Sequence, residues 1–178
     1  MKIYFVTGNE NKFKEAQSVI AEIERLDVDL PEIQSLDSQE IIEAKLKEVM
    51  AHHEGVFIVE DVSLTIKGMG GLPGPLIKWF LKSVGKEGVV KLAGVFGSEA
   101  VAKVVVGYKA ENKEIKYFEG VVEGDVVESR GDKGFGWDAI FRPKGSEKTF
   151  GEMELEEKNE FSMRRMALEK LKKEMSGK

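Results

Sequence analysis

The sequence predicts an α/β fold, in which two lobes with a mixed sheet lie around a cleft. Its first 59 residues read strand, helix, strand, helix, strand, an order typical of an α/β layer. Two long valine-rich runs, 101–110 and 114–129, are separated by Glu111-Asn112-Lys113 and predict an antiparallel hairpin. An amphipathic helix over 160–175 closes the chain. Since no repeat or linker interrupts these elements, we expect one domain over residues 1–178.

The first half of the chain alternates apolar runs with helical patterns. An apolar run at 3–7 predicts a strand, and the spacing of apolar residues predicts a helix over 12–23. Alternation over 25–30 predicts a second strand. A capping box, Asp37-Ser38-Gln39-Glu40, predicts a helix through residue 51. The continuous apolar run 56–59 is typical of a strand buried on both faces.

Glycine and proline divide the next part of the chain. Four glycines and two prolines over 68–75 predict a shaped loop. Two short helices are expected at 76–84 and 86–95, on either side of Gly85. A further short strand is expected at 139–141.

Composition excludes several kinds of chemistry. The 178 residues carry a net charge of −5, which disfavours a general nucleic-acid binder because such proteins need a basic face. There is no cysteine, and the two histidines, His52 and His53, are adjacent, so a nucleophilic triad is not expected. No signal or membrane-spanning pattern is visible, so we expect a cytoplasmic protein without a membrane partner. The remaining chemistry uses carboxylates, lysines, backbone amides or a metal held by oxygen.

A turn between the first strand and the first helix is a candidate phosphate site. Its residues are Thr7-Gly8-Asn9-Glu10-Asn11-Lys12. The N–H groups of a helix N-terminus favour anions, and glycine permits close approach of the backbone. The alternative is an ordinary strand-to-helix turn with a solvated lysine.

Glu60-Asp61 follows the buried run 56–59 and is a candidate metal site. Ligands bind beyond the carboxyl ends of strands in open α/β sheets, so this pair is expected to face the same crevice as Thr7. Two carboxylates beside a phosphate require a cation, and Mg²⁺ uses both kinds of oxygen. The alternative is a capping or turn aspartate before a strand at 62–66.

A third candidate is Gly134-Phe135-Gly136-Trp137-Asp138, which could stack a planar base and accept a hydrogen bond from it. The alternative is a tight turn that covers a core. Lys158 and Arg164 lie near the start of the last helix. The simple interpretation of both residues is a solvated surface charge. Lys78 lies within an apolar helix, where its stem can extend along apolar surface.

Taken together, these motifs resemble the inosine triphosphate pyrophosphatases, which hydrolyse non-standard purine triphosphates. The resemblance extends from residue 2 to about residue 172. The motifs that carry it are Thr7-Gly8-Asn9 with Lys12, Leu30-Pro31-Glu32, Glu60-Asp61, Gly70-Gly71-Leu72-Pro73-Gly74-Pro75 with Ile77-Lys78-Trp79-Phe80, Gly134-Phe135-Gly136-Trp137-Asp138 and Glu157-Lys158-Asn159. The family fold is an elongated mixed sheet in two lobes, and its members are usually homodimers.

The resemblance also implies roles for individual residues. It assigns the triphosphate to residues 7–12, Lys45 and Lys78, Mg²⁺ to Glu32 and Asp61, a backbone contact to Val62, and the base to Phe135, Gly136, Trp137, Asp138 and Lys158. Asp61 matches the general base. The implied reaction is metal-assisted hydrolysis at the α-phosphorus, which gives the nucleoside monophosphate and pyrophosphate.

One position departs from the family. Its base-recognition motif Ser-His-Arg reads Ser162-Met163-Arg164 here, so Arg164 is retained and Met163 replaces histidine. Loss of one donor softens discrimination against adenine unless Arg164 and backbone N–H groups suffice. Two other functions stay open, a nucleotide sensor without turnover and a pyrophosphatase of modified pyrimidine triphosphates. The Phe-Gly-Trp-Asp block and Arg164 favour purines.

Overall fold

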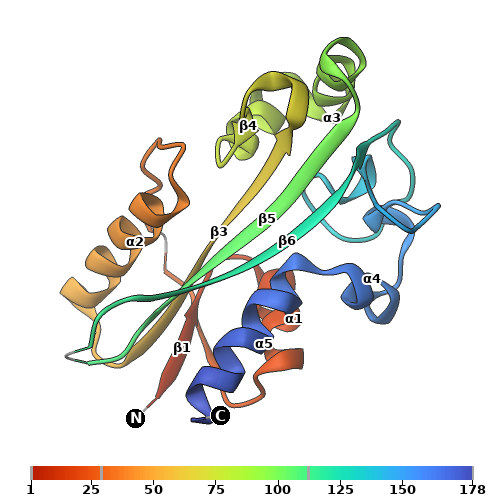
Figure 1. Cartoon of the computed structure of the whole chain (residues 1–178). Helices are drawn as coiled ribbons and strands as arrows, with labels where there is room; N and C mark the ends of the chain where they lie inside the picture. The colour runs from red at the N-terminus through yellow and green to blue at the C-terminus, as the bar shows by residue number, and fades with distance from the viewer. Residues whose placement is uncertain (1, 29, 112, 178) are drawn as a thin grey trace. The chain divides into compact units, whose positions relative to one another are not determined.

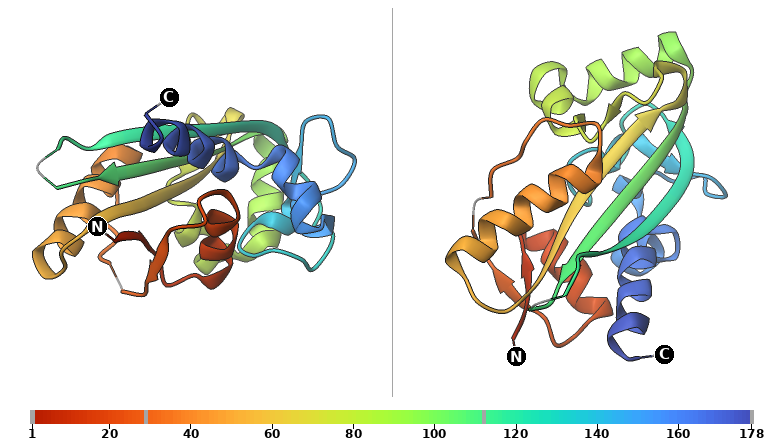
Figure 2. Two further views of the ribbon diagram at one scale, coloured as in Figure 1. Left: turned by 90° about the horizontal axis from the view of Figure 1, so that it is seen from below. Right: turned by 60° about the vertical axis from the view of Figure 1, so that its left-hand side comes forward.

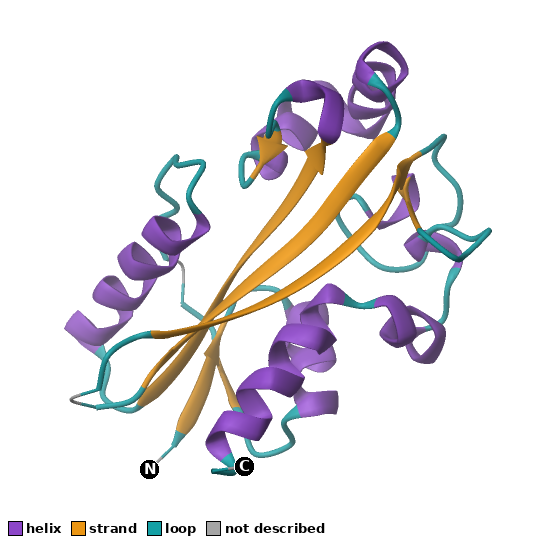
Figure 3. Cartoon of the chain, in the orientation of Figure 1, coloured by secondary structure: helices purple, strands orange, loops and turns teal. Residues whose placement is uncertain are grey.

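A mixed sheet organises the chain, as the sequence predicts. The computed structural model describes residues 2–28, 30–111 and 113–177. Strand β1 (Ile3–Val6) pairs in parallel with β2 (Glu24–Leu26) and with β3 (Val56–Ile66). The sheet order is β2-β1-β3-β5-β6-β7, and the short β4 (Pro73–Gly74) pairs antiparallel with β3 (Figures 1 and 3). The other elements are α1 (Glu10–Val19), α2 (Ser38–His52), η1 (Lys67–Met69), α3 (Ile77–Phe96), β5 (Glu99–Lys109), β6 (Lys116–Val126), η2 (Asp138–Ile140), β7 (Phe141–Pro143), η3 (Phe150–Glu152), α4 (Leu155–Phe161) and α5 (Met163–Met175).

The chain divides into two compact units, each built from separate segments. Unit 1 comprises Met1–Asp61, Val104–Gly120 and Arg164–Lys178, and unit 2 comprises Val62–Lys103 and Val121–Met163. Strands β3, β5 and β6 each contribute residues to both units. The predicted cleft between two lobes stays a prediction. None of the helices in the described part of the chain is long and apolar enough to cross a membrane.

In unit 1, helices cover both faces of the sheet. Helix α2 packs Ile42, Leu46 and Val49 against Phe57 and Val59 of β3. Helices α1 and α5 lie on the opposite face (Figure 2), where the Lys172 ammonium donates to the Val19 carbonyl at 2.8 Å. Consecutive side chains of a strand point to opposite faces, so β3 serves both layers.

The predicted start of α2 is confirmed. The Asp37 carboxylate accepts a hydrogen bond from the backbone N–H of Gln39 at 2.8 Å, as an N-cap residue does. The second hydrogen bond of a capping box, from the Asp37 N–H to the Glu40 side chain, runs through the Ser35 hydroxyl instead. That hydroxyl accepts from the Asp37 N–H at 3.0 Å and donates to the Glu40 carboxylate at 2.7 Å.

Three predicted elements have different bounds. Helix α1 ends at Val19 rather than at residue 23, because Ile20 is extended. Strand β2 ends at Leu26 rather than at residue 30. Strand β2 ends there because β1, with which it pairs, ends at Val6. Val28 and Leu30 still pack against the core. Asp29, inside the predicted strand, lies outside the described residues. The closing helix begins at Met163 rather than at residue 160.

In unit 2, the predicted pair of helices is confirmed. Gly85, with φ 70° and ψ −178°, breaks the helical path of α3 between them. The predicted loop 68–75 includes the last two residues of η1 and the two-residue strand β4. The strand expected at 139–141 is wrong in its position, because 138–140 form a 3-10 turn and the strand follows at Phe141. The predicted hairpin is present as β5 and β6, which are neighbours in the sheet.

Candidate active site

The turn after β1 has the expected geometry of a helix start. The Asn9 side chain caps α1, accepting from the N–H groups of Asn11 at 2.9 Å and Lys12 at 3.2 Å. The Asn9 N–H donates to the Thr7 hydroxyl at 3.1 Å. Strand β2 holds the other side of the turn, where the Thr7 N–H donates to the Leu26 carbonyl at 3.1 Å. The turn is therefore ordered by its own polar side chains, and its role as a phosphate site stays a prediction.

Arg25 of β2 also contacts this turn, and the sequence analysis did not single it out. Its guanidinium donates to the carbonyls of Thr7 at 3.1 Å and Gly8 at 3.0 Å. The signal available in the sequence was only a charged residue within an alternating run, which usually denotes a solvated strand face.

Glu60 and Asp61 do not follow a strand, as the sequence analysis expected, but lie in the middle of β3. Strand β1 ends at Val6, and its register with β3 places Phe5 beside Ile58, so β3 continues beyond the end of β1. The crevice argument therefore still applies to the end of β1. Because side chains alternate along β3, however, the two carboxylates point to opposite faces of the sheet. They cannot act as one pair.

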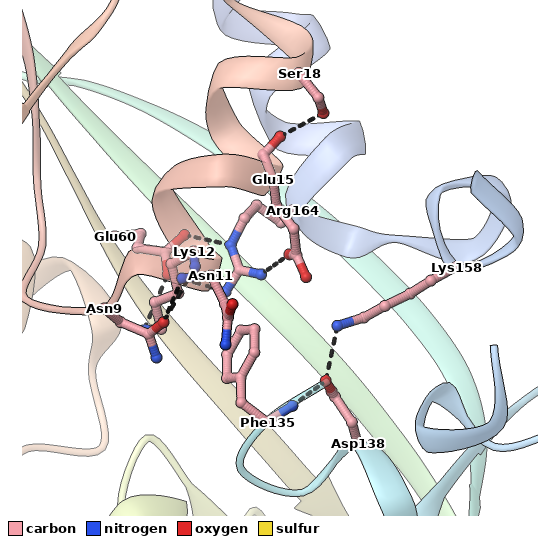
Figure 4. A network of polar contacts seen from close by, with 10 residues as sticks. All are labelled: Asn9, Asn11, Lys12, Glu15, Ser18, Glu60, Phe135, Asp138, Lys158 and Arg164. Carbon is pink, nitrogen blue, oxygen red and sulfur yellow. Dashed lines mark hydrogen bonds and ion pairs between the residues drawn. The ribbon is translucent and has the colours of Figure 1, made fainter. Parts of the chain in front are cut away.

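Glu60 points toward α1 and α5, into a buried group of ion pairs. The Arg164 guanidinium donates to both oxygens of Glu60, at 2.8 and 3.0 Å, and also pairs with Glu15 (Figure 4). The Lys12 ammonium lies 3.0 Å from the Glu60 carboxylate. Arg164 is only 2% exposed, so the interpretation of Arg164 as a solvated charge is wrong. A bidentate, buried pair of this kind fixes the relative positions of β3 and the two helices.

The charges around Glu60 determine its titration. Burial raises the pKa of Glu60, but the Arg164 guanidinium and the Lys12 ammonium outweigh it and lower the pKa to about 2. A group whose pKa is lowered on folding stabilises the protein above its unfolded pKa, and this stability is lost as pH falls toward the folded value.

We therefore expect Glu60 to contribute to acid unfolding. The wild-type free energy of unfolding should fall by about 3 kcal/mol on its account between about pH 5 and about pH 2. Urea unfolding at several pH values measures this change, with Glu60→Gln as the comparison. A Glu60→Gln variant with the same pH dependence as the wild type would assign acid unfolding to other carboxylates.

Asp61 points toward α2, where its surroundings differ from those of Glu60. Among the buried side-chain atoms of the described residues, Oδ2 of Asp61 stands out because it has no hydrogen-bond partner. Burial raises the pKa of Asp61, while the Ser38 hydroxyl and the Lys45 ammonium oppose the increase. Lys45 is held two turns after Ser38 on α2, and its ammonium donates to the Glu60 carbonyl at 2.9 Å. An unpartnered buried carboxylate oxygen calls for an explanation, and a bound ion or a catalytic role is one such explanation.

The residues around Asp61 fit a magnesium ion. Burial lowers the pKa of Lys45, and the charges of Asp61 and Glu32 oppose this decrease. Glu32 is exposed, and its carboxylate therefore acts on the same lysine as the Asp61 carboxylate. The described residues include no group of three or more carboxylates or histidines that would form a complete metal cage. Mg²⁺ does not need one, because it is commonly held by one or two carboxylates together with substrate phosphates. The Asp61 carboxylate has two oxygens, so it can serve as one such ligand while its unpartnered Oδ2 stays available for another role.

Unit 2 holds the predicted aromatic block in a turn whose last two residues, Trp137 and Asp138, are buried. The Asp138 carboxylate accepts from the Phe135 N–H at 2.9 Å and from the Lys158 ammonium at 2.8 Å (Figure 4). That ammonium also lies over the rings of Phe135 and Phe150, 4.9 and 5.5 Å from their centroids. Lys158 is 5% exposed and lies in α4, so its interpretation as a solvated charge is also wrong.

The two aromatic residues of this block have different surroundings. Trp137 is buried and packs edge-on against Phe141, with ring centroids 5.5 Å apart. This is the core-covering turn that the sequence analysis gave as its alternative. Phe135 is only half-buried. Of the two rings, Phe135 is therefore the better placed to stack on a planar ligand.

Gly134 is required by the Asp138 contact. A Cβ atom at Gly134 would lie 2.1 Å from Oδ2 of Asp138, and its φ is 75°. At Gly136 φ is 62°, but a Cβ would meet nothing within 4 Å. We expect Gly134→Ala to destabilise the protein by about 2 kcal/mol more than Gly136→Ala, because only the first adds a steric conflict to the backbone strain. Chemical unfolding of both variants measures the difference, and equal values would show that the turn relaxes without cost.

The other predicted site residues lie as follows. Val62 is half-buried in β3, and Lys78 is exposed in the first turn of α3. Met163, which replaces the family histidine, is buried at the first position of α5. Their contacts with substrate stay predictions.

Comparison with known proteins identifies the family. A sequence model of the Ham1 family matches residues 3–174, nearly the whole chain. The chain belongs to the Ham1 family. Ham1-type relatives named inosine triphosphate pyrophosphatase occur in Schizosaccharomyces pombe (43% identical, 96% of this chain and 93% of the relative) and Puccinia graminis (39%, 99% and 97%). The resemblance stated from the sequence is therefore confirmed.

Solved Ham1 structures also share the fold. The Ham1 protein of Staphylococcus aureus superposes with a TM-score of 0.82 over 99% of each chain, at 23% identity. The HAM1 protein of Coxiella burnetii gives a TM-score of 0.83 over the full length of both chains, at 22% identity. The α/β fold with a mixed sheet is thus that of the Ham1 family.

Proposed function

We propose that this chain is a nucleoside triphosphate pyrophosphohydrolase that acts on non-standard purine nucleotides such as ITP, dITP and XTP. It would release the monophosphate and pyrophosphate and so keep these nucleotides out of DNA and RNA. The observation that carries the proposal is the unpartnered, buried Oδ2 of Asp61, one strand away from a capped helix start. The names of the fungal relatives support the substrate class.

Asp61 has the properties of a general base. Burial raises its pKa and makes its carboxylate a better proton acceptor near neutral pH than an ordinary aspartate. Its Oδ2 would take a proton from the attacking water. The water oxygen then bonds to the α-phosphorus, and the bond from that phosphorus to the bridging oxygen of the β-phosphate breaks.

Mg²⁺ is the proposed metal, held by Asp61 and Glu32, and when bound it would supply a positive centre that polarises the phosphate oxygens. The protein's own cations contribute separately. The Lys12 side chain is 26% exposed while its ammonium contacts Glu60, and we assign this ammonium to a phosphate of the substrate. Lys45 is fixed by the Glu60 carbonyl beside Asp61. Both would offset negative charge on departing pyrophosphate.

A substrate panel tests the proposal. Purified protein with Mg²⁺ is mixed separately with ITP, XTP, GTP, ATP and a modified pyrimidine triphosphate, and products are separated by ion exchange. We expect inosine monophosphate and pyrophosphate in equal amounts, with ATP and GTP much slower. Inosine diphosphate with free phosphate would place attack at the γ-phosphorus and overturn the mechanism. Binding without product would indicate the nucleotide sensor, and preference for the pyrimidine would indicate the other alternative.

The homodimer and the cytoplasmic location are also part of this proposal. Both rest on the family resemblance and on the sequence, and neither is needed for the chemistry assigned to Asp61. Size-exclusion chromatography with light scattering measures the oligomeric state directly, and a monomer at micromolar concentration would contradict the proposed dimer.

A further inference from the structure

The Arg25 side chain binds the backbone of the turn after β1. The Nε of Arg25 donates to the Thr7 carbonyl at 3.1 Å, and one terminal nitrogen donates to the Gly8 carbonyl at 3.0 Å. With the bond from the Thr7 N–H to Leu26, strand β2 binds three backbone groups of Thr7 and Gly8. A planar guanidinium can bridge two carbonyls in this way because its donors have a fixed geometry.

Holding the carbonyls also orients the N–H groups of the turn. In a trans peptide, the carbonyl of one residue and the N–H of the next point in opposite directions within one plane. The bond from Arg25 to the Thr7 carbonyl therefore fixes the direction of the Gly8 N–H. The Asn9 N–H is held separately, because it donates to the Thr7 hydroxyl at 3.1 Å. Glycine has a wide choice of backbone conformations, so a turn containing Gly8 depends on such external restraint.

Arg25 also affects the charge beside the turn. Asp27 lies next to Gly8, since a Cβ at Gly8 would be 3.6 Å from the Asp27 carboxylate. An unpaired carboxylate at this position would repel a triphosphate. Arg25 pairs with Asp27 at 2.7 Å, and its side chain is 25% exposed, against 66% for Asp27. The guanidinium thus offsets this negative charge on the protein side of the turn.

We propose that Arg25 is a positioning residue for triphosphate binding, which acts through the backbone of Thr7 and Gly8 and by pairing Asp27. The proposal rests on the proposed function, in which this turn binds the phosphates. It predicts that loss of Arg25 weakens substrate binding and leaves the proton transfer at Asp61 nearly intact. A lysine cannot replace it, because one ammonium does not reproduce the two-pronged arrangement.

Steady-state kinetics with ITP and Mg²⁺ test this role in Arg25→Ala and Arg25→Lys. We expect KM to rise about tenfold or more in Arg25→Ala, with kcat within about threefold of the wild type. Arg25→Lys should also show a raised KM. Added guanidinium ion should lower the KM of Arg25→Ala and leave that of the wild type unchanged. The matched control is Lys2→Ala, which removes the 2.9 Å ion pair of Lys2 with Glu24 of β2 without touching the turn.

The outcomes separate this inference from the proposed function. If the wild type releases pyrophosphate but both Arg25 variants keep its KM, the positioning role is wrong. Equal increases of KM in Lys2→Ala and Arg25→Ala would also overturn it, because general weakening of β2 would then explain both. If the wild type itself forms no pyrophosphate, the proposed function fails. Inorganic triphosphate binding, measured by calorimetry, would still test the turn, and equal affinities of wild type and Arg25→Lys would overturn the inference.

Discussion

Asp61→Asn should abolish most of the pyrophosphate release while leaving the protein folded. Replacing a general base removes about 10²–10⁴-fold in kcat. Loss of a proposed metal ligand should bring the decrease to the upper end of this range. The stability should not fall, because burial raises the pKa of Asp61 and the fold therefore disfavours its charged form. Pyrophosphate release and urea unfolding measure the two effects.

The control for this variant is Glu22→Gln, which neutralises an exposed carboxylate. It should have the kinetics and the stability of the wild type. A rate for Asp61→Asn within about tenfold of the wild type would remove Asp61 from the chemistry. A normal rate together with a large loss of stability would make Asp61 a structural residue.

Arg164→Ala should cause the largest loss of stability. It leaves the carboxylates of Glu60 and Glu15 buried without their shared guanidinium partner. Removing one partner of a buried ion pair costs about 3–5 kcal/mol, since the remaining charge keeps its desolvation cost. The pairing joins residues 104 positions apart in the sequence, so its loss should affect α1, β3 and α5 together.

The adjacent arginine provides a matched control. Arg165 is 44% exposed at its side chain and pairs with Glu169 one helical turn later. Exposed pairs of this kind contribute about 0.3–0.5 kcal/mol, so Arg165→Ala should have nearly wild-type stability. Chemical unfolding measures both variants. If Arg164→Ala lost no more stability than Arg165→Ala, the buried ion pairs would not hold unit 1 together.

Local signals in the sequence predicted local structure well. The Asp37 cap of α2 and the break at Gly85 depend on residues within one turn of each other, so their chemistry is visible in a short window. The family resemblance found Lys158 and Arg164, but their burial was missed. Their partners Asp138 and Glu60 lie 20 and 104 residues away, and no short-range pattern reports such a pairing.

The course of β3 is the clearest limit of sequence patterns. Acidic residues are depleted in strands, so Glu60-Asp61 after an apolar run predicts the end of a strand. Tertiary contacts override this tendency, since Glu60 finds a guanidinium and Asp61 lies beside Ser38 and Lys45. Arg25 was missed for a related reason. Its partners are backbone carbonyls, which every residue has and which therefore leave no trace in the sequence.

Glu60 and Asp61 lie in one continuous strand, so the face of the sheet that each one occupies depends on the number of residues that precede it in the strand. A deletion of one residue between 56 and 59 would keep both carboxylates in the protein but exchange their faces. Asp61 would then meet the cations of α1 and α5, and Glu60 would meet α2. A single-residue insertion or deletion in this strand would therefore need a compensating β-bulge to keep both carboxylates on their present faces.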